Sequence, residues 1–133
     1  MTPENVIEQW ANDFNSADTK SILSLYHHSA TLLPTFLPKL LTSNNEIKGY
    51  FEVAFNGDAT VEVNVEDAII KELPGNNFLI TGNYIFCLGS KGDKKYLSWY
   101  SFLVDLSSDS PIRHHHSSRV PFEFDLSQTE EKH

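Results

Sequence analysis

The segment NFLITGNYIFCLGSKGDKKYLSWYSFLVDLSSDSPIRHHHSSRVPFEF, residues 77–124, decides the fold of this chain. It is rich in β-branched and aromatic residues, which favour strands, and it is broken twice by polar segments typical of turns. Connections this short join antiparallel neighbours. We therefore predict a meander whose strands cover 77–88, 95–106 and 112–124.

The segment before this meander, residues 59–73, also predicts a strand. Val61, Val63 and Val65 alternate with polar residues, which is typical of a strand with one buried face. The alternation slips near Asp67, and a β-bulge would cause such a slip. We therefore expect a fourth strand with a bulge.

The N-terminal part is expected to be helical. An apolar stripe at three- and four-residue steps predicts a first helix from Thr2 or Pro3. Asp18 would cap a second helix, with Tyr26 on its inner face and the pair His27–His28 at its end. After a short strand at 30–36, Ser43 would start a third helix. The stripe of the first helix consists of Val6, Ile7, Trp10, Phe14 and Ala17.

These elements predict the α+β class. A long antiparallel sheet must cover one face, and only the N-terminal helices are available to cover it. We expect a cone-shaped, strongly curved antiparallel or mixed sheet wrapped over three helices, with a ligand pocket between the layers. The expected organisation is one domain over residues 1–126 and a polar C-terminal tail over 127–133.

Composition excludes several classes of function. The 133 residues carry a net charge of −8, and the cluster Lys91, Lys94 and Lys95 fits a hairpin tip, so we expect no nucleic-acid partner. No apolar run is long enough to span a membrane, and we see no signal peptide, so we expect no membrane partner and a cytoplasmic location. The single cysteine, Cys87, excludes a disulfide framework and is expected to be buried.

The histidine triplet lies on the last predicted strand. Side chains alternate along a strand, so three consecutive histidines cannot all face one site. His114, His116 and Ser118 would share one face, while the other would carry Arg113, His115, Ser117 and Arg119. We expect the face with both arginines to meet solvent, which turns His114, His116 and Ser118 into the cone.

Three interpretations of this inward face stay open. His114 and His116 could bind zinc with a third ligand from His27, His28 or a carboxylate. The histidines could instead satisfy one another in a polar core. Finally, they could form a metal-free polar site with inward hydroxyl groups, which both donate and accept hydrogen bonds and suit a small oxygen-rich ligand. Candidate hydroxyl groups belong to Thr35, Tyr50, Thr81, Tyr84, Ser98 and Tyr100.

Three motifs carry a family resemblance. The layout from about Glu4 to Phe122 resembles the nuclear transport factor 2-like superfamily, in the branch related to the association domain of calcium/calmodulin-dependent protein kinase. HHHSSRVP (114–121), together with LLPTF (32–36) and IKGYF (47–51), resembles the iota class of carbonic anhydrase, whose members carry an HHHSS signature on the last strand.

The resemblance implies reversible hydration of CO2 to bicarbonate, without a metal or other cofactor. It assigns catalytic roles to Thr35, Tyr50, His116 and Ser118. Thr35, Tyr50 and Ser118 would also bind substrate oxygens, and His116 would orient Ser118 or pass the proton onward. The apolar wall that CO2 requires would consist of Phe36, Phe51, Phe102 and Leu33.

Two other functions stay open, because this fold hosts many activities. The first is a non-catalytic association module that joins copies through the exposed sheet face. Leu97, Trp99 and Leu103 alternate on one face of a strand; Trp99 would mark an interface if it points outward and belong to the core if it points inward. The second is an enzyme of the polyketide-cyclase or ketosteroid-isomerase type, which would use an Asp or His base. Asp67 and Asp105 lie at a bulge or a strand end, which speaks against that type. We expect a homodimer in every case.

Overall fold

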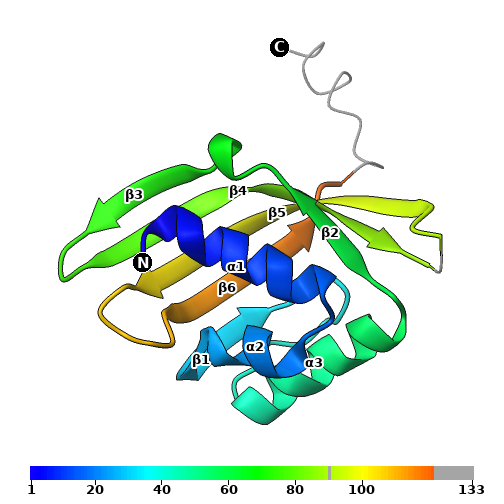
Figure 1. The fold of residues 1–133 in the computed structure, drawn as a ribbon, viewed down its shortest axis with the longest axis horizontal. Helices are drawn as coiled ribbons and strands as arrows, with labels where there is room; N and C mark the ends of the chain where they lie inside the picture. The colour runs from blue at the N-terminus through cyan, green and yellow to red at the C-terminus, as the bar shows by residue number, and fades with distance from the viewer. Residues whose placement is uncertain (90, 122–133) are drawn as a thin grey trace.

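The computed structural model describes residues 1–89 and 91–121, and these form helices packed against one curved sheet (Figure 1). The predicted tail 127–133, and the last part of the predicted domain, lie outside these described residues. The elements in chain order are α1 (Pro3–Asn15), α2 (Thr19–Ser24), β1 (Tyr26–Leu33), α3 (Asn44–Asn56), β2 (Thr60–Val63), the 3₁₀ helix η1 (Val65–Asp67), β3 (Ile69–Leu73), β4 (Asn77–Leu88), β5 (Lys94–Asp105) and β6 (Ile112–Arg119).

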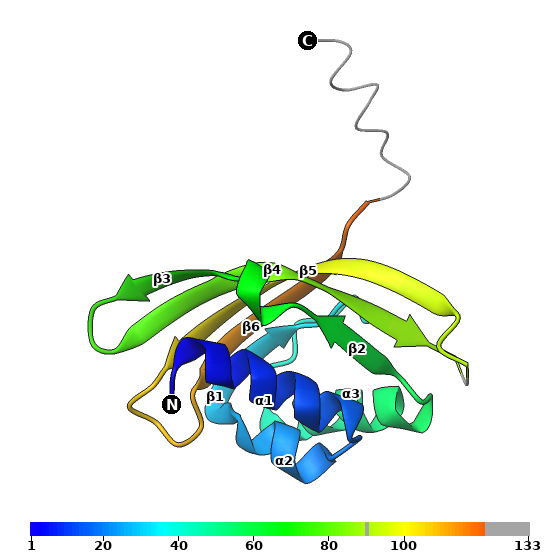
Figure 2. The same ribbon diagram turned by 45° about the horizontal axis from the view of Figure 1, so that its top comes forward.

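Within the described residues the sheet has six strands in the order β1-β6-β5-β4-β2, and β3 pairs with β4 beside β2. β1 runs parallel to β6, whereas the other pairs are antiparallel. The sheet bends over the helices, which all lie against its concave side (Figure 2). The predicted α+β class with a curved mixed sheet is thus confirmed. The expected meander is present, but its last strand, predicted over 112–124, ends at Arg119; residues 122–124 lie outside the described part of the chain.

Local sequence explains where the helices begin. Thr2 accepts a hydrogen bond from the backbone N–H of Asn5 and caps α1, and Pro3 occupies the first turn, where its missing N–H costs nothing. Ser43 caps α3 in the same way through the N–H of Glu46. The expected apolar stripe of α1 is buried against the sheet, apart from Ala17, which follows the helix.

Two predicted boundaries are wrong. The second helix ends at Ser24, and Tyr26, His27 and His28 belong to β1 instead of the helix. Parallel pairing with β6 overrides the helical pattern here, because the N–H of Ile112 donates to Leu25 O at 2.8 Å. The predicted strand 59–73 is two strands, β2 and β3. Asn64 interrupts it by accepting from the N–H of Glu66 and capping η1.

The predicted inward face of β6 is also wrong. His115 and Ser117 are buried, with 2% and 4% exposure, whereas His116 is exposed on the opposite face and Ser118 is half-buried there. The cause is a bulge, because Leu103 pairs with His114 while the adjacent Val104 pairs with Ile112, which leaves Arg113 as an extra residue. One extra residue moves every following side chain to the other face of the sheet.

The arginine argument failed because each arginine has a local partner. Arg113 Nη1 lies 3.6 Å from Asp105 Oδ2 at the bulge. Arg119 shares the face of Ser117 but stands at the strand end, where its guanidinium lies 4.6 Å from the centre of the Tyr96 ring. A terminal arginine can therefore share a face with buried residues without being buried itself.

The two faces of the sheet differ as expected along β5. Tyr100 and Phe102 are buried in the core, while Trp99 is 51% exposed on the opposite face. Cys87 is buried, as predicted, and its thiol donates a hydrogen bond to Glu62 Oε2 at 3.2 Å. None of the helices in the described part of the chain is long and apolar enough to cross a membrane.

Candidate functional site

His115 is the centre of a polar group inside the apolar core. Its ring stacks on Phe102, with the ring centres 4.0 Å apart. Nδ1 is hydrogen-bonded to the hydroxyl group of Tyr26 at 2.8 Å, and Nε2 to the hydroxyl group of Tyr84 at 3.0 Å. Both ring nitrogens of a buried imidazole are therefore satisfied, which fixes its orientation.

Ser117 extends this group toward the segment after β1. The Tyr84 hydroxyl group donates to Ser117 Oγ at 2.5 Å, and Ser117 Oγ is hydrogen-bonded to Thr35 Oγ1. Thr35 follows Pro34, where β1 has ended, so its side chain comes from an irregular segment. It is partly exposed, whereas Ser117 is not. The chain of hydroxyl groups therefore ends near the surface at Thr35.

The other end of the chain is closed by α1. The indole Nε1–H of Trp10 donates to the hydroxyl oxygen of Tyr26 at 3.0 Å. Trp10 is 1% exposed and also stacks against the Tyr84 ring at 5.5 Å. In order, the core chain consists of Trp10, Tyr26, His115, Tyr84, Ser117 and Thr35.

All titratable members of the core chain are held neutral. Burial lowers the pKa of His115 well below its usual range, and the neighbouring His114 and His116 lower it further. Burial likewise raises the pKa of Tyr84 and of Tyr26 well above the ordinary value of 10. The core chain contains no carboxylate group, so its members present dipoles instead of charges.

An apolar pocket of about 530 Å³ lies beside the Thr35 end, between α3 and the segment that follows β1. Phe36 and Tyr50 both line this pocket, and the Tyr50 hydroxyl group is hydrogen-bonded to the backbone of Phe36. Burial raises the pKa of Tyr50 to about 12. At the rim, Lys39 Nζ lies 2.6 Å from Glu46 Oε2. The remaining wall is made mostly of aliphatic and aromatic side chains.

The structure brings together only part of the predicted site. Thr35 belongs to the core chain. Tyr50 lines the pocket but has no bond to this chain. His116 and Ser118 point away from the core chain, because the bulge at Arg113 turns both side chains to the other face of the sheet.

The predicted apolar wall is divided as well. Phe102 lies against His115, and Phe51 is buried between Tyr26 and Tyr50. Phe36 reaches the pocket with 38% exposure, whereas Leu33 is 37% exposed on the opposite side of the sheet.

Four side chains of the core chain were missed as a group. His115 and Ser117 lie within the HHHSS motif but were placed on the other face. Trp10 and Tyr26 were assigned to apolar stripes, and a stripe does not reveal that the polar tip of an aromatic ring meets a partner. Tyr84 was named among the hydroxyl candidates, and alternation along β4 could have placed it inward.

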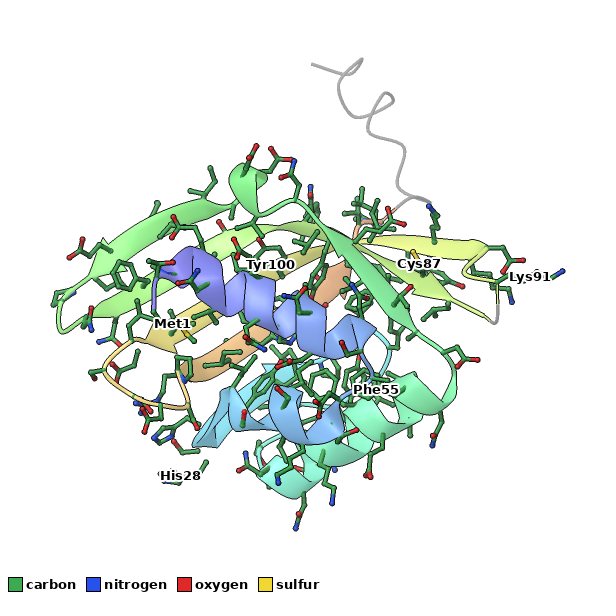
Figure 3. The ribbon with its side chains drawn as sticks, in the orientation of Figure 1. Met1, His28, Phe55, Cys87, Lys91 and Tyr100 are labelled. Atoms are coloured by element: carbon green, nitrogen blue, oxygen red, sulfur yellow. The ribbon has the colours of Figure 1, made fainter. Side chains whose placement is uncertain are left out.

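The residues present do not fit a zinc site of the expected kind. Within 1–89 and 91–121, no group of three His, Cys, Asp or Glu side chains lies together as metal ligands do. His114 Nδ1 is hydrogen-bonded to Thr31 Oγ1 at 2.6 Å. The ring centres of His27 and His28 lie 4.1 Å apart, and His28 lies at the edge of the molecule, well away from the buried Tyr100 (Figure 3).

Comparison with known proteins identifies the fold. No family model and no curated protein matched the chain. Among solved structures, a protein from Xanthomonas campestris assigned as a calcium/calmodulin-dependent protein kinase II association domain is similar, with a TM-score of 0.77 and 23% identity, over 87% of this chain and 84% of that one.

Two further structures have the same architecture. A protein from Streptomyces avermitilis, assigned as a dehydratase of the nuclear transport factor 2-like family, has a TM-score of 0.73 and 13% identity, over 87% of this chain and 91% of that one. A domain from Nostoc punctiforme with a cystatin-like fold has a TM-score of 0.73 and 14% identity, over 97% of this chain and 80% of that one. At these identities the likeness shows a nuclear transport factor 2-like, or cystatin-like, fold.

Proposed function

We propose that this protein is a carbonic anhydrase that hydrates CO2 reversibly without a metal. The observation that carries the proposal is the core chain of neutral hydroxyl and imidazole groups that ends at Thr35 beside an apolar pocket. CO2 is apolar and needs an apolar wall, while bicarbonate has oxygen atoms that hydroxyl groups bind. The resemblance of HHHSSRVP to the iota class agrees with this assignment.

The proposed roles follow the positions of the side chains. Water attacks the carbon of CO2, and bulk water, with a pKa of about 15.7, is a poor nucleophile without help. Thr35 would hold a developing bicarbonate oxygen, Ser117 would orient Thr35, and Tyr84 and His115 would keep Ser117 in place. Phe36 and Tyr50 would line the approach. Positioning of this kind contributes several kcal/mol when the reacting atoms are aligned, up to about 7–11.

The decisive experiment is stopped-flow CO2 hydration on protein that has been exhaustively chelated, and again after zinc is added. Activity that survives chelation supports a metal-free carbonic anhydrase. Activity that appears only with zinc would reject the metal-free mechanism. No activity in either state would reject the proposed function.

Neighbouring serines supply a matched pair of variants. Ser117→Ala removes the hydroxyl group that joins Tyr84 to Thr35, so we expect kcat/KM to fall by a factor of about 10 to 1,000, the range for loss of one stabilising donor. Ser118→Ala removes a hydroxyl group on the opposite face and should keep wild-type activity. Both variants are measured in the same stopped-flow assay, with circular dichroism to check folding. An equal loss of activity in both variants would contradict the assignment of Ser117 to the site.

The size of the pocket favours one alternative function. At about 530 Å³ the pocket is far larger than CO2 requires and falls within the range for small organic ligands. A dehydratase or cyclase acting on an apolar substrate would use such a volume, and the fold is shared with a protein assigned as a dehydratase. This alternative gains support if the protein lacks CO2 hydration but a hydrophobic dye binds the pocket and Val53→Trp displaces it.

A further inference from the structure

The hydrogen bonds of the core chain have a direction, and the direction is set at Trp10. An indole nitrogen donates and cannot accept, so the Tyr26 oxygen must be the acceptor in the 3.0 Å bond. The Tyr26 hydroxyl group keeps its own proton, because burial raises its pKa. The only acceptor described near that proton is His115 Nδ1, at 2.8 Å. A buried donor without an acceptor is costly, so Tyr26 donates to His115.

The next step fixes the tautomer of His115. A neutral imidazole has one donor and one acceptor nitrogen. Since Nδ1 accepts from Tyr26, the ring proton must be on Nε2, which donates to the Tyr84 oxygen at 3.0 Å. Tyr84 then donates to Ser117 Oγ at 2.5 Å. Either oxygen could donate in the bond between Ser117 and Thr35. Because Ser117 is buried and its proton has no other acceptor among the described residues, we infer that Ser117 donates to the Thr35 oxygen.

We propose that the core chain is polarised in one direction, from Trp10 to Thr35, so that the hydroxyl group of Thr35, the residue before Phe36 in the pocket wall, is left as a hydrogen-bond donor. Trp10, Tyr26 and His115 are positioning residues in this scheme. The consequence for catalysis rests on the proposed function. Thr35 would donate to one oxygen of CO2 while a water oxygen forms the new bond to carbon, and a carbon–oxygen π pair would move onto the oxygen that Thr35 holds.

The direction of the hydrogen bonds also decides between two roles for His115, which could polarise Thr35 or carry a proton away from the site. A proton entering at Thr35 could travel inward only if every bond reversed, and Trp10 cannot accept at the far end. The core chain therefore polarises the Thr35 hydroxyl group but does not conduct protons away from the site. The proton lost by the attacking water passes to solvent or to a buffer base, which completes bicarbonate and one released proton.

The test is nitrogen NMR of protein labelled with ¹⁵N in its histidines, with His115→Gln used to assign the signal of His115. We expect a neutral ring protonated at Nε2 at neutral pH. Protonation at Nδ1 would overturn the proposed direction whether or not the protein hydrates CO2. A ring protonated at Nε2 in a protein without CO2 hydration would support the direction and refute the carbonic anhydrase.

Two tyrosine variants complete the test. Tyr26→Phe removes the donor to Nδ1, so the signal of the second tautomer should appear and kcat should fall about two- to tenfold, as expected for one lost hydrogen bond. Tyr100→Phe is the control, because the Tyr100 hydroxyl group is buried without a hydrogen-bond partner among the described residues. It should leave the His115 signal and kcat unchanged. An unchanged tautomer in Tyr26→Phe would overturn the role of Tyr26.

Discussion

At the scale of the residue, His115 shows how a polar side chain can occupy an apolar core. Its ring is 2% exposed, stacks on Phe102, and is bonded at both nitrogens by tyrosine hydroxyl groups. Each partner hydroxyl group is itself bonded again, so the described chain satisfies its buried polar atoms. Such a network fixes one arrangement of the core, and losing one member leaves others unpaired.

The burial of His115 predicts acid-sensitive stability. Its pKa in the folded protein lies well below 6.5, so below pH 6.5 the unfolded chain binds a proton that the folded chain does not. The free energy of unfolding should then fall by about 1.4 kcal/mol per pH unit from this group, from pH 6.5 down to the pKa of the folded state. His114, whose pKa burial also lowers, acts in the same direction.

Urea denaturation from pH 7 to pH 5 measures this effect. His115→Phe should be less stable than the wild type at pH 7, because Tyr26 and Tyr84 lose their partner, but its stability should depend less on pH. If His115→Phe had the same pH dependence as the wild type, His115 would not be buried in the neutral form.

At the scale of the element, sequence patterns predicted which segments form strands and helices better than they predicted which face of a strand is buried. The apolar stripe of α1 and the meander were correct, because each depends on a periodicity that many residues share. The face of β6 was wrong because it depends on one local feature. Arg113 bulges out of the ladder, and no residue in IRHHHSSR indicates by type that a bulge occurs there. The same shift hid the pairing of Ser117 with Thr35, which are distant in sequence.

The space around two glycines, one in β4 and one in α3, predicts opposite effects on stability when each is replaced by alanine. A Cβ at Gly82 would lie 2.7 Å from the Tyr100 hydroxyl oxygen, and the Tyr100 ring is held by Tyr84 and Phe102. Gly82→Ala should therefore lower the free energy of unfolding by about 1–3 kcal/mol. Gly49→Ala, in α3, meets no atom within 4 Å and should raise stability by about 0.5–1 kcal/mol. Chemical denaturation measures both, and a stable Gly82→Ala would contradict the packing.

At the scale of the whole molecule, the open face of the sheet contrasts with the rest of the chain. One row of paired residues crosses this face without an acidic or basic side chain other than a histidine, although the net charge of the protein is −8. Trp99 stands beside this row with 51% exposure, and Ile69 within it is 59% exposed. The row consists of Ile69, Thr81, Ser101, His116 and Leu33.

An uncharged row across an exposed sheet face, with Trp99 beside it, predicts association of two copies. Copies of an acidic chain repel one another, so contact is favoured where like charges are absent. Trp99→Lys would place a cation beside the row in that contact, and two copies would bring the two cations together. We expect the wild type to sediment as a dimer and Trp99→Lys as a monomer.

A matched variant separates this contact from a general effect of added charge. Val53→Lys changes an exposed apolar residue of α3, with 74% exposure against 51% for Trp99, on the helical side of the molecule. It should remain dimeric in sedimentation velocity at the same protein concentration. A wild type that sediments as a monomer at every concentration would show that the open face does not join two copies.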